Sequence, residues 1–138
     1  MADDGPTHVV DANIVLAWSL ERPYSRVALE LRGSGHRLIA PDLVVAEAGS
    51  ALSWYVKNAV LTLEQAHDAL STITTFVPLV SAAELRREAL RLSVETGHPI
   101  YDCFYPALAL LVSRPLVSAD AKLLALANRI SIETIAFD

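Results

Sequence analysis

Short blocks of apolar residues alternate with helix-like patterns along the chain. Strands are predicted over residues 8–10, 37–40, 76–80, 116–118 and 132–135, where apolar or β-branched runs are bounded by polar residues or proline. Helical periodicity predicts helices over residues 12–20, from Ser25 to Gly33, from Asp42 to about Asn58, from Thr62, from Ser81 to Gly97, over 100–112 and over 120–128. Such alternation predicts an α/β fold with a parallel sheet covered on both faces.

Several residues are predicted to cap these helices or to mark where they begin. Asp42 is expected to cap the helix that follows it, and Thr62 is a candidate cap with Glu64 in the first turn. Ser81 and Glu84 have the spacing of a capping box. Because Pro106 would deprive the Asp102 carbonyl of its helical partner, a kink or a late helix start is expected there.

Composition narrows the class of protein. The chain has 138 residues, 53% of them hydrophobic, and a formal net charge of −5, which indicates one folded domain over residues 1–138. Its single cysteine, Cys103, excludes an internal disulfide, and no secretory signal or membrane-spanning run is present, so a cytoplasmic protein is expected. The negative charge disfavours unspecific binding to nucleic acid, and the high apolar fraction suggests a covered interface.

Four acids interrupt apolar stretches, where an ionised carboxylate needs a partner: Asp11, Glu47, Asp102 and Asp120. Helix capping alone would explain Asp11 and Asp120, and Asp102 could serve a helix dipole. Glu47 lies on the border between an apolar and a polar stripe, where it could simply face solvent. Taken together, however, a parallel sheet could bring all four to one rim.

Carboxylates gathered at one rim would repel one another, and a divalent cation removes that conflict. Oxygen ligands without cysteine or paired histidines suit Mg²⁺ or Mn²⁺. Because such an ion binds phosphate and lowers the pKa of a water molecule, the implied chemistry is attack of an activated water on a phosphodiester.

Four segments of the chain resemble the PIN-domain ribonucleases, and within them the VapC-type toxins of toxin–antitoxin pairs. They are the residues Val9-Val-Asp-Ala-Asn-Ile-Val-Leu16, Pro41-Asp-Leu-Val-Val-Ala-Glu47, Tyr101-Asp-Cys-Phe-Tyr-Pro-Ala-Leu-Ala109 and Leu116-Val-Ser-Ala-Asp-Ala-Lys-Leu123. The resemblance implies a three-layer α/β/α PIN-like domain with a central parallel sheet of four or five strands. It also implies one or two Mg²⁺ or Mn²⁺ ions held by Asp11, Glu47, Asp102 and Asp120.

The same resemblance implies cleavage of single-stranded or looped RNA, leaving a 5′-phosphate and a 3′-hydroxyl. It further implies a homodimer and a cognate VapB-type antitoxin that blocks the acidic groove. Asn13 stands where the family usually has a hydroxyl residue, and its amide could still orient a ligand, so altered affinity with retained activity is expected. Ser118 keeps the hydroxyl expected two residues before the last acid.

Other residues have simpler interpretations. Cys103 is expected to be a buried thiol, and the four histidines are expected on the surface or in loops. Five aromatic residues are expected in the core rather than in an RNA-stacking platform: Trp18, Trp54, Tyr55, Phe104 and Tyr105.

Six basic residues are expected to be solvated, although they could contact RNA phosphates: Arg22, Arg26, Arg86, Arg87, Arg114 and Lys122.

Two rival hypotheses stay open. A haloacid-dehalogenase-like phosphatase would also place an aspartate after the first strand, but it needs a second one where this chain has Asn13. A non-catalytic acidic interaction module would use the carboxylates as helix caps. Titration with manganese separates this module from a metal-dependent nuclease, because the module should show no saturable stabilisation whereas the nuclease should melt at a higher temperature.

Overall fold

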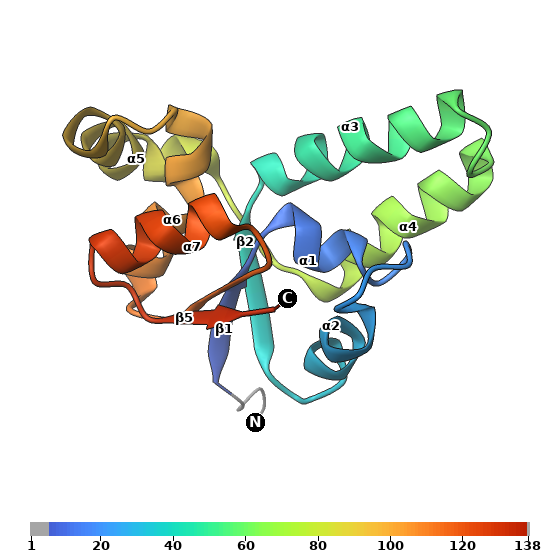
Figure 1. Ribbon diagram of the computed structural model, residues 1–138, viewed down its shortest axis with the longest axis horizontal. Coiled ribbons are helices and arrows are strands. Elements are labelled where there is room, and N and C mark those ends of the chain that lie inside the picture. The colour runs from blue at the N-terminus through green and yellow to red at the C-terminus, as the bar shows by residue number, and fades with distance from the viewer. Residues whose placement is uncertain (1–5, 138) are drawn as a thin grey trace.

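The computed structural model describes residues 6–137, and its centre is a five-stranded sheet in the order β3-β2-β1-β4-β5 (Figure 1). All neighbouring strands pair in parallel, and Val9 in the central strand faces Ile39 on one side and Leu116 on the other. The strands are β1 Thr7–Val10, β2 Arg37–Pro41, β3 Leu79–Val80, β4 Leu116–Ser118 and β5 Thr134–Ala136. The prediction of an α/β fold with a parallel sheet of four or five strands is confirmed.

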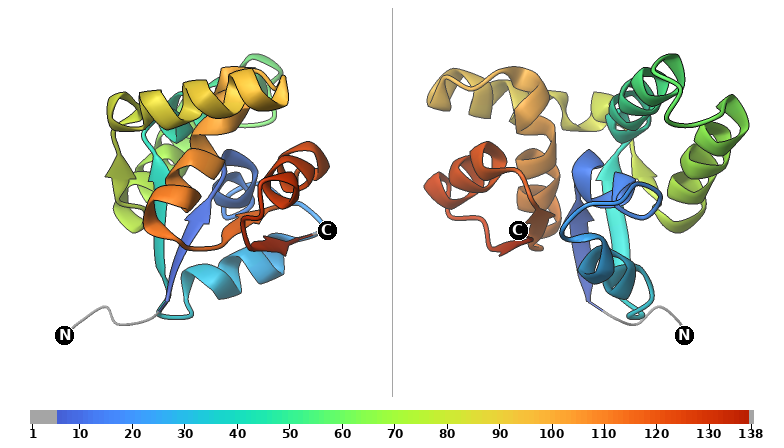
Figure 2. Two further views of the ribbon diagram at one scale, coloured as in Figure 1. Left: turned by 90° about the vertical axis from the view of Figure 1, so that its left-hand side faces the viewer. Right: turned by 45° about the vertical axis from the view of Figure 1, so that its right-hand side comes forward.

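Helices pack on both faces of this sheet (Figures 1 and 2). They are α1 Ala12–Leu16, α2 Ser25–Arg32, α3 Leu43–Lys57, α4 Leu63–Phe76, α5 Ala82–Thr96, α6 Ile100–Val112 and α7 Ala121–Arg129. Adjacent strand residues point to opposite faces, so Val10 joins a core with α1 to α4, whereas Val9 joins a second core with α5 to α7. The three-layer arrangement follows from this alternation.

Three elements are shorter than predicted; the last of them, β5, begins at Thr134 rather than at residue 132. The strand predicted over residues 76–80 is wrong at its start, because α4 continues to Phe76 and the Val77 N–H still donates to the Ile73 carbonyl. Pro78 then ends the helix, and its carbonyl accepts from Ala40 as the chain joins the sheet. The helix predicted over 12–20 ends at Leu16, beyond which the backbone bonds tighten into turns.

The helix caps differ from prediction in their partners. Asp42 makes no side-chain bond to its own helix; its carboxylate instead accepts from the Ala82 N–H of α5 at 3.0 Å. Ser81 accepts from Ala83 N–H, and no reciprocal bond from Glu84 forms among residues 6–137. Thr62 caps α4 with Glu64 in the first turn, as predicted, and Thr62 and Gln65 also form a reciprocal capping box there.

Four expectations about single residues can be compared with the structure. Cys103 is fully buried, as predicted, and α6 begins before Pro106 and runs through it, so the alternative of a late helix start is wrong. His8 was expected at the surface but is 5% exposed, because it lies in the central strand and stacks on His36 with ring centroids 4.6 Å apart. Trp54 was expected in the core but is 58% exposed near the end of α3.

A carboxylate-lined pocket as the candidate active site

Each of the four predicted acids lies near the start of a different helix. Asp11 follows β1 and caps α1, and Asp120 follows β4 and caps α7. Asp102 lies in the first turn of α6, and Glu47 lies near the beginning of α3. All four line one pocket of about 230 Å³, together with Ala12, Asn13, Leu16, Ala51, Tyr105 and Leu123. The structure therefore brings these separate segments to one rim, at the carboxyl ends of the central strands (Figure 1).

Asp11 is the most enclosed of these carboxylates, with 3% of its surface exposed. Its Oδ1 accepts from the Ile14 N–H at 3.0 Å, which is the capping bond expected at a helix start. Its Oδ2 accepts from the Ser118 hydroxyl, whose oxygen in turn accepts from the Asp120 N–H at 2.9 Å. Ser118 thus connects the ends of β1 and β4 and positions two of the acids.

This arrangement disfavours the ionised form of the Asp11 carboxyl. Burial raises the pKa of its carboxyl from 3.8 to about 6, although the hydrogen bonds from Ser118 and Ile14 oppose the shift. The charges of Asp120 and Glu47 raise the pKa further. Asp11 is therefore a carboxylate that the fold holds among like charges, which is a position a cation would stabilise.

Glu47 has a partner that the sequence analysis did not identify. The hydroxyl of Tyr105 donates a hydrogen bond to Glu47 Oε1. Burial raises the pKa of Glu47, the bond from Tyr105 lowers it, and the charge of Asp102 raises it. Burial and Glu47 also raise the pKa of Tyr105, so its hydroxyl keeps its proton.

A signal for Tyr105 was present in the sequence. It stands three residues after Asp102, a spacing that places both on one face of α6. Tyr105 is 3% exposed, which confirms the expectation that it is buried.

Asp102 and Asp120 leave carboxylate oxygens open toward the pocket. Asp120 Oδ1 accepts from Lys122 N–H at 2.9 Å, so the prediction that Asp120 caps a helix is confirmed. No hydrogen bond within residues 6–137 uses the Asp102 carboxylate. Asn13 is exposed and also lines the pocket, where its amide can reach a bound molecule.

The donor set fits a hard divalent cation. Within the described residues, no group of three or more His, Cys, Asp or Glu side chains is arranged so that it could hold a metal ion. The acids around the pocket nevertheless supply only oxygen donors, and the pKa of Asp11 is raised chiefly by burial and further by the charges of Asp120 and Glu47. Mg²⁺ keeps several waters and is commonly held by one or two carboxylates, so this open arrangement suits it.

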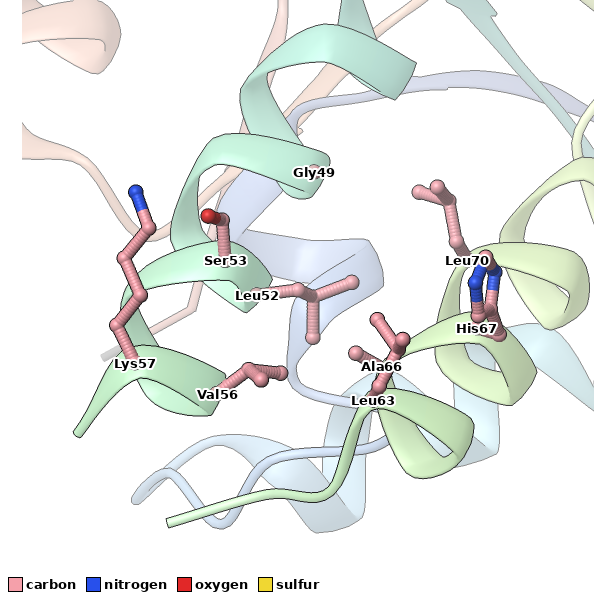
Figure 3. Close-up of a pocket in the computed structure, with 9 residues that line it drawn as sticks. All are labelled: Gly49, Leu52, Ser53, Val56, Lys57, Leu63, Ala66, His67 and Leu70. Atoms are coloured by element: carbon pink, nitrogen blue, oxygen red, sulfur yellow. The ribbon is translucent and has the colours of Figure 1, made fainter. Parts of the chain in front are cut away.

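A second pocket, of about 270 Å³, lies between α3 and α4 and has a different character. Figure 3 shows Leu52 and Val56 of α3 directed toward Leu63 and Ala66 of α4. No carboxylate lines this pocket, and its polar groups are those of Ser53, Lys57 and His67. It offers a place for apolar groups and none of the acidic chemistry of the first pocket.

A three-layer parallel α/β domain with clustered carboxylates at the carboxyl edge of its sheet is typical of a metal-assisted hydrolase acting on phosphate esters. The model of the PIN domain family matches residues 8–138, and the chain belongs to this family. The resemblance stated from the sequence is thereby confirmed.

Individual relatives agree with this assignment. The chain is 26% identical over 118 residues to Ribonuclease VapC3 of Pyrobaculum aerophilum, which covers 83% of this chain and 90% of that protein. The crystal structure of PAE2754 from Pyrobaculum aerophilum matches with a TM-score of 0.73 at 23% identity, covering 94% of this chain and 83% of the other. VapBC2 from Rickettsia felis, bound to a DNA fragment from its promoter, matches with a TM-score of 0.67 at 16% identity, covering 96% and 99%.

The family match and the likeness to Ribonuclease VapC3 support a nuclease, and the two solved structures support the fold. They give no support to the hypothesis of a haloacid-dehalogenase-like phosphatase. Among residues 6–137, no helix is both long enough and apolar enough to span a membrane.

Proposed function

We propose that the protein is a metal-dependent endoribonuclease toxin that cleaves single-stranded or looped RNA. The observation that carries this proposal is the convergence of Asp11, Glu47, Asp102 and Asp120 on one pocket. The family match and the likeness to Ribonuclease VapC3 point to the same activity. PIN-domain ribonucleases generally use divalent metal ions, which agrees with the all-oxygen donor set.

The proposed cofactor is one or two Mg²⁺ or Mn²⁺ ions, held by Asp102, Asp120, Glu47 and Asp11 with waters completing the shell. When bound, such an ion would polarise the scissile phosphate and lower the pKa of a water molecule, so that hydrolysis leaves a 5′-phosphate and a 3′-hydroxyl.

The chain's own residues prepare the pocket for this task. Tyr105 keeps its hydroxyl proton and uses it to fix Glu47 Oε1, which leaves the other oxygen of Glu47 for a ligand. Ser118 fixes Asp11 and the backbone of Asp120 at the same time. Asn13, exposed at the pocket, can orient the substrate through its amide.

The proposed partners are a VapB-type antitoxin and a second copy of the chain. The likeness to VapBC2 supports the antitoxin, since that structure's name pairs a VapB with a VapC. Several large apolar side chains are exposed and could be covered in such assemblies, including those of Trp54, Val60, Leu63, Val94 and Leu111.

The activity is tested by incubating the purified protein with a labelled single-stranded RNA in Mg²⁺, in Mn²⁺ and in excess EDTA. We expect cleavage with either metal, no cleavage in EDTA, and products that a 5′-phosphate-dependent exonuclease can degrade. Cleavage that continues unchanged in EDTA would contradict the metal dependence. An RNA that stays intact under all metal conditions would contradict the proposed function itself.

A further inference from the structure

A positively charged side chain is held next to the acidic pocket by groups that carry no negative charge. Arg22 lies in the segment between α1 and α2, and its Nη2 donates to the Tyr55 hydroxyl of α3 at 2.7 Å. Its Nη1 donates to the Glu21 backbone carbonyl at 3.1 Å. The guanidinium also lies 5.7 Å from the centre of the Tyr55 ring. These contacts fix Arg22 in place without neutralising it.

The backbone around Arg22 is fixed as well. The Arg22 N–H donates to Ser25 Oγ at 2.8 Å, and that hydroxyl donates to the Leu20 carbonyl at 2.9 Å. Within residues 6–137 Arg22 forms no ion pair, in contrast to Arg91, which lies between Glu88 and Glu95. Within the described residues its N–H donors bond the Glu21 carbonyl and the Tyr55 hydroxyl and also reach the neutral Tyr24 hydroxyl, which leaves donors for an anion.

Two observations place this cation beside the acidic pocket. Glu47, Ala51 and Tyr55 follow one another at intervals of four residues on α3, and the first two line the pocket. The same face of the helix therefore runs roughly 12 Å from Glu47 to Tyr55, whose hydroxyl accepts from Arg22. In addition, Tyr24 is close enough to feel the charges of both Arg22 and Asp11. Burial raises the pKa of Tyr24, the charge of Arg22 lowers it, and the charge of Asp11 raises it.

We propose that Arg22, positioned by Tyr55, binds a second backbone phosphate of the RNA beside the one that is cleaved. This inference rests on the proposed ribonuclease function. The chain carries a net charge of −5 and its pocket is lined by acids, so its overall charge repels RNA. The guanidinium of Arg22 is fixed at the Tyr55 end of α3 and keeps donors for an anion. It supplies the attraction that would align the RNA strand across the carboxylates.

The exposed Trp54 ring stands edge-on to Tyr55, with ring centroids 5.2 Å apart, and restrains the tyrosine from its outer side. A merely structural role for Arg22, joining the segment after α1 to α3, would account for the same contacts. The two roles differ in what they predict for RNA, because only a phosphate contact releases a counterion on binding.

The test compares Arg22→Gln with Arg87→Gln, a matched loss of charge at an exposed position on α5. Steady-state cleavage of a single-stranded RNA gives kcat and KM, and fluorescence anisotropy gives the salt dependence of binding. For Arg22→Gln we expect KM to rise about 10-fold with kcat nearly unchanged, the pattern of a lost binding contact. The slope of log K against log salt should fall in magnitude by about 0.7, while Arg87→Gln keeps the parent values.

Two further variants keep the test decisive if Arg22→Gln unfolds. Arg22→Lys keeps the charge and should retain the parent salt slope with a smaller rise in KM. Tyr55→Phe removes the hydroxyl that holds Arg22 and should raise KM about 3-fold at an unchanged salt slope. Parent KM and slope in Arg22→Gln, or a loss confined to kcat in both Arg22 variants, would overturn the inference. Since the parent protein cleaves RNA in that case, the proposed function would stand; absence of cleavage by the parent protein would instead refute that function.

Discussion

The two pockets on either side of α3 have similar volumes, about 230 Å³ and about 270 Å³, but they arise in different ways. The apolar pocket is made by successive turns of α3 and α4, which are neighbours in sequence. The acidic pocket takes its carboxylates from four helices spread over the chain, and only the parallel sheet brings them together. The packing of two consecutive helices is enough to form the apolar pocket. The acidic pocket forms only when the topology of the sheet brings distant segments together.

The largest difference between the pockets should appear in catalysis. Asp102→Asn removes a charge that no hydrogen bond within residues 6–137 uses, so the fold should persist while RNA cleavage falls more than about 100-fold. Asp11→Asn should abolish cleavage as well. Leu63→Ala in the apolar pocket is the control and should cleave RNA at the parent rate. Undiminished hydrolysis by both purified aspartate variants would refute the assignment of the site.

Stability should show the opposite pattern. Leu52 is 2% exposed and forms one wall of the apolar pocket, so Leu52→Ala should lower the free energy of unfolding by about 2–5 kcal/mol. Leu63→Ala, at a side chain that is 64% exposed, should cost less than about 1 kcal/mol. Urea titrations of the three proteins measure both values. Equal losses in the two variants would show that the pocket is not part of the packed core.

A smaller effect should reveal the strain at Asp11. Because its pKa is raised from 3.8 to about 6 in the folded protein, ionisation there opposes folding. The penalty is absent below the unfolded pKa and is complete once the pH exceeds the folded one. Without metal, Asp11→Asn should therefore raise the free energy of unfolding by about 1–3 kcal/mol at neutral pH, and the gain should vanish near pH 4. A gain that stays constant over this range of pH would contradict the electrostatic origin.

The smallest effect is expected at Glu47, which is only partly buried. Burial and then the charge of Asp102 raise its pKa, so Glu47→Gln should remove a partly buried charge and stabilise the metal-free protein, by less than about 1 kcal/mol once solvent screening is allowed for. The amide oxygen can still accept from Tyr105. Thermal unfolding with and without Mn²⁺ should show a weaker metal response in the variant than in the parent protein. Identical responses would remove Glu47 from the proposed ligands.

Most strands and helices, and the positions of the four acids, could be predicted from the sequence because they depend on the local order of residues along the chain. Asp11 and Asp120 follow buried strands and precede helices, so the parallel sheet places both at its carboxyl edge. The start of β3 was predicted wrongly because Phe76 and Val77 are apolar and fit either a strand or the end of a helix. His8 was placed at the surface because a polar residue gives no sign that a central strand buries it.

The supporting contacts of the site could not be predicted, since they join distant positions. The bond between Tyr105 and Glu47 spans 58 residues, and that between Arg22 and Tyr55 spans 33. Neither pair has a spacing in the sequence that identifies the partner. Only the folded arrangement, which brings Tyr105 of α6 and Arg22 of the segment after α1 next to α3, determines which hydroxyl meets which acid or cation.

The most direct test of the central claim is a calorimetric titration of the metal-free protein with Mn²⁺, repeated on Asp102→Asn. The account predicts saturable binding of one or two ions to the parent protein and a large loss of affinity in the variant. Absence of saturable binding to the parent protein, or the same affinity in both proteins, would contradict it.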